Sequence, residues 1–221
     1  MVASIWEMDA LSLIKLGGPI MVPILICSLL ALGIVIEKLI YLSSIKLNLA
    51  QFKSQVFDSI KHNRIKEAIQ RCDENPTPTA KVLKAGIMKF GSSREAIKES
   101  MEGASLLEVP KLENRLSAMA TIAHITPLLG LLGTVTGMIN IFHTIQARAA
   151  SLNPATPGDL AGGIGEALIT TLTGLMVAIP AYVAYNYCIH RVNHCILEIE
   201  QAATELVNFL SQITESTPQD M

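Results

Sequence analysis

Apolar residues concentrate in three stretches of the chain, and this pattern predicts three helices that cross a membrane. Each stretch is close to the roughly 20 residues that a spanning helix needs. The first predicted span covers residues 19–42, and its first part, Pro19–Ile36, contains no charged residue. The second covers residues 117–146, which hold no Asp, Glu, Lys or Arg, and the third covers residues 159–187. The chain is therefore predicted to be an all-α integral membrane protein with three transmembrane helices.

Between the first two predicted spans, residues 43–116 have the apolar spacing of amphipathic helices with polar outer faces. Thr77 is predicted to cap a helix that has Pro78 at its first position. Ser92 and Glu95 match a capping box at the start of the next helix. The segment contains no catalytic triad, metal-ligand spacing or phosphate-binding loop. We therefore expect a small helical domain.

The positive charges predict the orientation of the spans. Most of the 17 Lys and Arg residues lie between Lys46 and Arg115, whereas the opposite side of the predicted spans has only Lys15 and Arg148. Because positively charged loops stay on the cytoplasmic side, the helical domain is expected to be cytoplasmic. The remaining predicted segments are a periplasmic N-terminus at residues 1–18, a periplasmic loop at residues 147–158, and a cytoplasmic C-terminal helix and tail at residues 188–221.

Composition supports a membrane protein and disfavours several other classes. Hydrophobic residues make up 50% of the chain and charged residues 16%, which is below the roughly 25% of an average soluble domain. The net charge of −2 gives no reason to expect a nucleic-acid partner. His190 and His194 lie one helical turn apart, but on one helix they point away from the nearby Cys188 and Cys195. We therefore predict no metal site and no cofactor. The four cysteines lack the spacing of a disulfide framework, so they are expected to be free thiols.

Four polar residues in the second and third predicted spans are candidates for an ion pathway. Glu166 lies about two turns inside the third span, where a carboxylate is costly unless it faces protein or water. The alternative for Glu166 is a side chain that reaches the headgroups. Thr134 and Thr171 are equally far in sequence from the predicted loop, so antiparallel spans would place both hydroxyls at the same depth. The alternative for both is a hydrogen bond to their own helix. Thr170 shares a helix face with Glu166.

Small residues beside these polar groups predict close packing between helices. Glycines at every third or fourth position let two helix backbones approach each other. A proline inside a span can bend the helix. A helix that is small or polar on two sides is expected to be enclosed by protein on both. The residues predicted to shape the packing are Gly130, Gly133, Gly137, Gly174, Pro127 and Pro180.

Two long motifs in these spans resemble those of the MotA/TolQ/ExbB proton-channel family. They are LLGLLGTVTGMINIF in the second span and GGIGEALITTLTGLMVAIPAYVAYN in the third. The order of the motifs, the three spans, the large cytoplasmic insert and the short outer loop also agree with that family. The chain looks most similar to the ExbB-type members, then to TolQ, and less to the MotA-type stators.

The resemblance implies an oligomeric assembly and assigns roles in it to some residues. Members of the family form homopentamers around two copies of a single-span partner of the ExbD or TolR type, whose helix carries an intramembrane Asp. By their positions in the motifs, Thr134 and Thr171 match the family's pore-facing threonines, and Glu166 matches its third-helix glutamate. The lipid bilayer and a TonB-like protein are the other partners that the resemblance implies.

The expected function is that of a channel subunit in a motor of the bacterial inner membrane, driven by the proton-motive force. With an ExbD-like subunit, such a motor energises TonB-dependent uptake across the outer membrane. One alternative is a TolQ-type subunit of the Tol-Pal system, which maintains the envelope. A second alternative, from another class, is a passive oligomeric channel or scaffold. No enzymatic activity is predicted, because apart from Glu166 the spans hold no nucleophile–base pair.

Overall fold

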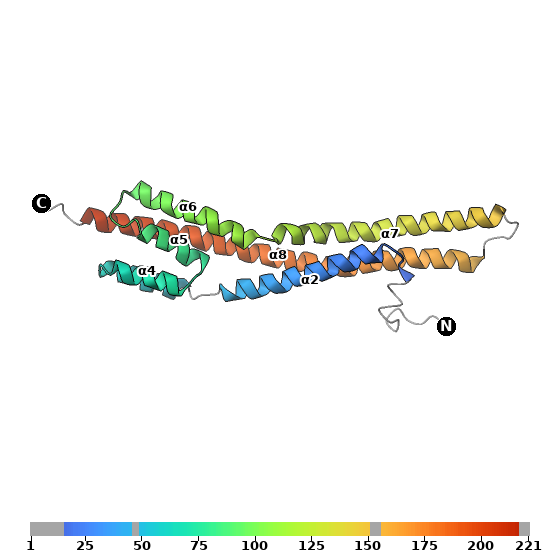
Figure 1. Cartoon of the computed structure of the whole chain (residues 1–221), viewed down its shortest axis with the longest axis horizontal. Coiled ribbons are helices and arrows are strands. Elements are labelled where there is room, and N and C mark those ends of the chain that lie inside the picture. The colour runs from blue at the N-terminus through green and yellow to red at the C-terminus, as the bar shows by residue number, and fades with distance from the viewer. Residues whose placement is uncertain (1–15, 46–48, 151–155, 217–221) are drawn as a thin grey trace. The chain divides into compact units, whose positions relative to one another are not determined.

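The computed structural model describes residues 16–45, 49–150 and 156–216 (Figure 1). Most of the predicted N-terminal segment and residues 151–155 of the predicted loop lie outside the described residues. Every regular element in the described ranges is an α-helix, and none is a strand. The helices are α2 (Met21–Ser44), α3 (Leu49–Lys61), α4 (Ile65–Glu74), α5 (Pro78–Ile87), α6 (Arg94–Glu113), α7 (Leu116–Ala150) and α8 (Pro157–Ser216).

Three helical stretches are long and apolar enough to cross a membrane. They are α2 itself, a stretch within residues 94–149 and a stretch within residues 160–213. Much of the apolar surface of α2 is exposed in the single chain, and Leu29 has 72% of its surface exposed. An apolar surface of this kind indicates contact with lipid or with other protein. These stretches confirm the predicted all-α class with three membrane-spanning helices.

The chain forms two compact units. Unit 1 comprises residues 1–37 and 115–187, and unit 2 comprises residues 38–114 and 188–221. The change from α6 to α7 falls at this division, where Arg115 adopts a left-handed φ of 64°. A left-handed residue cannot continue a helix, so α6 and α7 are separate elements rather than one long helix.

In unit 1, small side chains hold α2 against α7 and α8. The helices α7 and α8 run antiparallel and side by side, as Figure 1 shows. A cluster of buried residues, each at most 9% exposed, joins all three helices. Three of its four members are alanines, and such small side chains allow helix backbones to approach closely. The cluster consists of Ala31 from α2, Ile122 and Ala123 from α7, and Ala181 from α8.

In unit 2, the helices α3 to α6 pack with the C-terminal part of α8. The rings of Phe57 in α3 and Phe209 in α8 have centroids 5.2 Å apart. A methyl group added at Gly86 in α5 would lie 2.8 Å from Cγ of Met101 in α6 and 3.2 Å from Cδ2 of Leu206 in α8. Helix α8 therefore packs against both α3 and α5.

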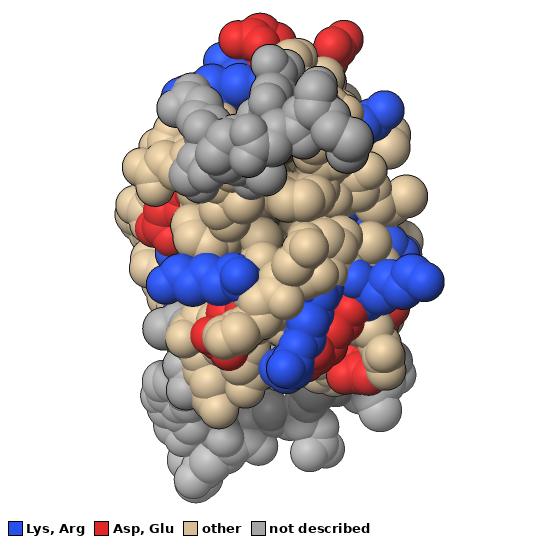
Figure 2. Space-filling model, turned by 90° about the vertical axis from the view of Figure 1, so that its left-hand side faces the viewer, with Lys and Arg blue, Asp and Glu red and all other residues tan. Residues whose placement is uncertain are grey.

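Ion pairs between helices reinforce this bundle. Lys53 of α3 pairs with Glu205 of α8 at 2.5 Å. The buried Glu108 of α6 accepts from Lys81 of α5 at 3.0 Å and from Lys111 of its own helix at 2.5 Å. Figure 2 shows one face of the molecule, on which Lys and Arg side chains are interspersed with Asp and Glu. The face shown therefore has no extended region of a single charge.

Side-chain caps define the starts of two helices in unit 2. Thr77 caps α5, as predicted, by accepting a hydrogen bond from a backbone N–H of the first turn. The prediction for α6 is wrong by one residue, since its N-cap is Ser93 rather than Ser92. Ser93 accepts from the N–H of Ala96 at 3.3 Å. With the cap at Ser93, the third helical position is Ala96 instead of Glu95, so the predicted capping box does not form.

Candidate functional site

Helices α7 and α8 approach each other so closely that α7 needs glycine at the contact. A methyl group added at Gly133 would lie 2.5 Å from Cβ of Thr170, and one added at Gly137 would lie 2.9 Å from Cβ of Ala167. Carbon atoms in ordinary contact are about 3.5–4.0 Å apart. The two backbones can therefore reach this separation only where α7 carries hydrogen in place of a side chain.

The same contact continues one turn further along both helices. A methyl group at Gly130 would lie 3.1 Å from Cα of Thr171, and one at Gly174 would lie 3.0 Å from Cα of Gly130. All four glycines that the sequence marks for packing thus lie on the surface shared by α7 and α8. Pro127 and Pro180 both lie inside helices, in α7 and α8 respectively.

The two neighbouring threonines of α8 both face this contact but bond differently. The hydroxyl of Thr171 donates to the carbonyl of Gly130 across the two helices at 2.9 Å. The side chain of Thr170 is only 1% exposed, and its hydroxyl donates to the carbonyl of Ala167 in its own helix at 2.8 Å. Thr171 is therefore the residue that links α7 to α8, whereas Thr170 fills the space opposite Gly133.

Thr134 lies on α7 close to this contact and is partly buried. Its hydroxyl donates to the carbonyl of Leu131 in its own helix at 2.6 Å, which is the bonding pattern that we set out as the alternative. Gly133, which precedes Thr134, lies against Thr170, and Thr171 bonds to the carbonyl of Gly130, so Thr134 and Thr171 lie within about one helical turn of each other along the contact.

Glu166 lies one turn before Thr170 on α8 and is partly buried. The Thr170 hydroxyl, which donates to the Ala167 carbonyl, also lies 3.1 Å from the backbone carbonyl of Glu166. The Glu166 side chain contacts the chain at Gly18, just before α2 begins. The segment just before α2 therefore lies against the Glu166 carboxylate.

Sequence reasoning missed three residues that belong to the same contact. Thr126 is fully buried on α7, and its hydroxyl donates to the carbonyl of Ile122 at 2.6 Å. Gly163 and Ala167 extend the small surface of α8, since both lie against Gly137. A sequence pattern could have identified Gly163 and Ala167, because small residues recur from position 163 to position 174 at intervals of three or four. The prediction named only Thr170, Thr171 and Gly174 from this series.

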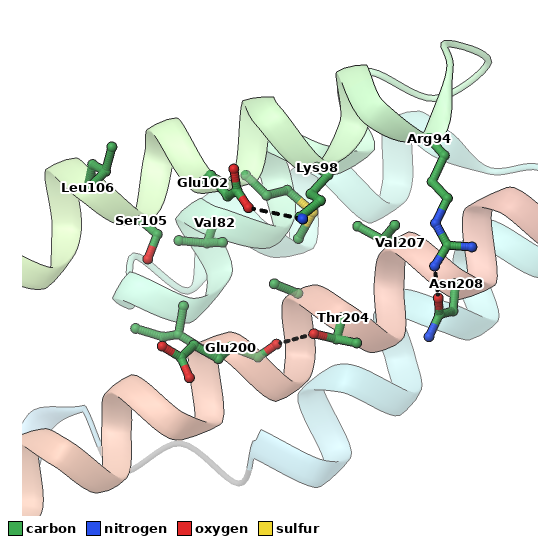
Figure 3. A pocket seen from close by; sticks show the side chains of 13 residues that line it. Val82, Arg94, Lys98, Glu102, Ser105, Leu106, Glu200, Thr204, Val207 and Asn208 are labelled. Carbon is green, nitrogen blue, oxygen red and sulfur yellow. Dashed lines mark hydrogen bonds and ion pairs between the residues drawn. The ribbon is translucent and has the colours of Figure 1, made fainter.

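Unit 2 contains a groove of about 790 Å³ that none of these residues lines. Helices α5, α6 and α8 line it, as Figure 3 shows. Arg94 donates to Asn208 across the groove at 2.6 Å, and Lys98 lies 3.5 Å from Glu102. Its basic groups are therefore already engaged with polar neighbours. No group of three or more His, Cys, Asp or Glu side chains that could hold a metal ion occurs among the described residues.

Fold and contact surface together define a polytopic helical membrane protein. Two of its spans pack through glycines and carry hydroxyl groups, and one span holds a carboxylate. Residues 74–201 match the model of the MotA/TolQ/ExbB proton channel family. The matched range includes α5, α6, α7 and most of α8.

Individual relatives agree with this match. The chain is 32% identical over 171 residues to the biopolymer transport protein ExbB-like 3 of Synechocystis sp., covering 77% of this chain and 80% of that one. It is 30% identical over 199 residues to the Tol-Pal system protein TolQ of Haemophilus influenzae, covering 85% and 82%. It is 30% identical over 165 residues to the biopolymer transport protein exbB1 of Vibrio cholerae, covering 72% and 70%.

The chain belongs to the MotA/TolQ/ExbB proton channel family. It is thus a multi-pass inner-membrane protein and a channel subunit, in a family that is not a class of enzymes. The relatives include both ExbB-type and TolQ-type proteins at similar identity. Identity alone therefore does not separate these two types.

Proposed function

We propose that the chain is the channel subunit of a motor in the bacterial inner membrane that is driven by the proton-motive force. Five copies would surround two copies of a single-span, ExbD-like subunit. The complex would energise a TonB-like protein and, through it, uptake across the outer membrane. The ExbB-type relatives from Synechocystis sp. and Vibrio cholerae are consistent with this role.

The observation that carries the proposal is the carboxylate of Glu166 within an otherwise uncharged part of α8. Between Leu160 and Tyr187, Glu166 is the only Asp, Glu, Lys or Arg. An ionisable residue inside a membrane-spanning helix marks an ion pathway by default, since its burial is costly. Glu166 is only partly buried in the single chain, which leaves its carboxylate within reach of water or of an acid on a partner.

The second acid of the proposed pathway comes from the partner. In the predicted spans, residues 19–42, 117–146 and 159–187, the only Asp is Asp159 at the first position of the third span. The intramembrane Asp that the family uses is thus expected on the ExbD-like subunit. Large apolar side chains on α7, such as Leu128 at 62% and Phe142 at 60% exposure, supply surface for neighbouring subunits.

Two substitutions test the proposed pathway in the complete complex. Glu166→Gln and Thr171→Val are expected to abolish energised uptake, while the complex still assembles with its ExbD-like partner. Thr144→Val is the control, since the Thr144 hydroxyl donates within its own helix to the carbonyl of Asn140. Normal uptake in both Glu166→Gln and Thr171→Val would contradict the site. A wild-type complex that conducts protons without any energised uptake would instead indicate a passive channel.

A TolQ-type role is the second candidate, and the match to the Haemophilus influenzae TolQ protein favours it. Complementation separates the two roles. An ExbB-type subunit restores TonB-dependent uptake in a strain without its own ExbB. A TolQ-type subunit restores resistance to detergent in a strain without TolQ. Rescue of the second strain alone would replace the uptake function by a role in envelope integrity.

A further inference from the structure

The carboxylate of Glu166 lies against a backbone turn from a distant part of unit 1. A methyl group added at Gly18 would lie 3.0 Å from Cδ of Glu166 and closer still to Oε1. The carboxylate thus occupies the place that a side chain at position 18 would take. Contact at this distance is possible only because residue 18 has no Cβ.

Gly18 is also held in a conformation that favours glycine. Its φ is +66°, in the left-handed region that other residues rarely adopt. Its carbonyl accepts from the N–H of Met21 at 3.2 Å, and the carbonyl of Pro19 accepts from Val22 at 3.3 Å. These bonds form the first turn of α2, so the position of Gly18 is set by that helix.

The other side of the contact is fixed as well. Thr170, one turn after Glu166, is buried against Gly133 of α7 and donates to the Glu166 carbonyl. The backbone of α8 therefore cannot shift freely at Glu166. In addition, the start of a helix carries partial positive charge, which favours a carboxylate beside the first turn of α2.

We propose that Gly18 is a positioning residue for Glu166. The turn that precedes α2 forms a wall against which the carboxylate rests, and this wall fixes where the acid of α8 meets its proton donor or acceptor. The inference depends on the proposed function, because the position of the carboxylate affects transport only if Glu166 takes part in proton passage. A larger residue at position 18 displaces the carboxylate without removing it.

The test measures proton flux in proteoliposomes that contain the complete complex with its ExbD-like subunit. Gly18→Ala is expected to reduce flux about tenfold or more, since a misplacement of about 1 Å can cost a hundredfold in rate. Gly33→Ala is the matched control on α2, because a methyl group there meets nothing within 4 Å. Gly91→Ala controls for backbone strain, since Gly91 has a φ of +83° and also meets nothing within 4 Å.

A rescue variant separates positioning from a loss of folding. Glu166→Asp shortens the side chain by one methylene and removes the crowding at position 18. Gly18→Ala should therefore cost several-fold less flux in the Glu166→Asp background than in the wild type. If Gly18→Ala alone fails to assemble, restored assembly in the double variant supports the same contact.

Two results overturn the inference while leaving the proposed function intact. One is wild-type flux in Gly18→Ala, and the other is an equal loss with either acid at position 166. Absence of proton flux in the wild-type complex, by contrast, overturns the proposed function itself. The wild-type measurement therefore distinguishes the two failures before any variant is compared.

Discussion

Substitution of Gly133 by alanine tests the central contact of unit 1. The added methyl group would lie 2.5 Å from Cβ of Thr170, about 1 Å closer than carbon atoms normally approach. Helices α7 and α8 must therefore separate locally by about 1 Å. Overpacking of this kind costs about 1–3 kcal/mol.

Separation of the helices has a second cost at Thr171. Its hydrogen bond to the carbonyl of Gly130 is 2.9 Å long, and a 1 Å shift takes it beyond hydrogen-bonding range. A hydrogen bond of this type contributes about 1 kcal/mol. Where nothing crowds the added methyl group, alanine in place of glycine in a helix raises stability by about 0.5–1 kcal/mol. This gain is expected for Gly33→Ala, since a methyl group there meets nothing within 4 Å. The two variants should therefore differ by about 2–4 kcal/mol.

Thermal unfolding in detergent, followed by circular dichroism, measures this difference. For a chain of this size, 1 kcal/mol corresponds to about 2–4 °C, so Gly133→Ala should unfold about 4–16 °C below Gly33→Ala. Adding Thr170→Gly to Gly133→Ala restores the missing space and should recover part of the loss. If Gly133→Ala is as stable as Gly33→Ala, the close approach of α7 and α8 is refuted.

Three further predictions concern single side chains. Thr171→Val should lower the free energy of unfolding by about 1 kcal/mol in the same measurement, while Thr134→Val should have little effect, since its hydroxyl bonds within α7. Burial raises the pKa of Glu108, but hydrogen bonds from neighbouring lysines outweigh this and hold its pKa below the usual range. Its contribution to stability is thus present above the ordinary Glu pKa of about 4.3 and lost as pH falls through the lower folded value. Acid unfolding followed by circular dichroism should start at higher pH in Glu108→Gln, whose stability is reduced by about 2 kcal/mol at neutral pH. Burial raises the pKa of the Cys72 thiol to about 11, so a maleimide at pH 8 should label it only after unfolding, with Cys72→Ser as the control for mass-spectrometric detection.

Local patterns in the sequence were sufficient for the fold and for part of the site. The apolar stretches predict the three spans because a membrane imposes both length and polarity on a helix. The cap at Thr77 follows from the adjacent proline, which fixes the start of α5. Serines at positions 92 and 93 offer equivalent caps, so the sequence alone does not choose between them.

Contacts between distant segments could not be predicted in the same way. Neighbouring residues on a helix are about 100° apart, so a wide contact can include both Thr170 and Thr171. The contact of Gly18 with Glu166 joins two segments that share no periodic pattern. The only local sequence feature that points to this contact is Gly18, close to the start of α2.

The contacts divide the four proposed pathway residues into two kinds. Thr170 is only 1% exposed in the surface between α7 and α8, so a proton path along its hydroxyl requires these helices to separate. Glu166, Thr134 and Thr171 are partly accessible without any such movement. If the helices stay packed during transport, Glu166→Gln should stop flux in a complex of normal stability. Thr170→Val should then reduce stability and flux together, and a stable Thr170→Val complex without flux would show that the path runs between α7 and α8.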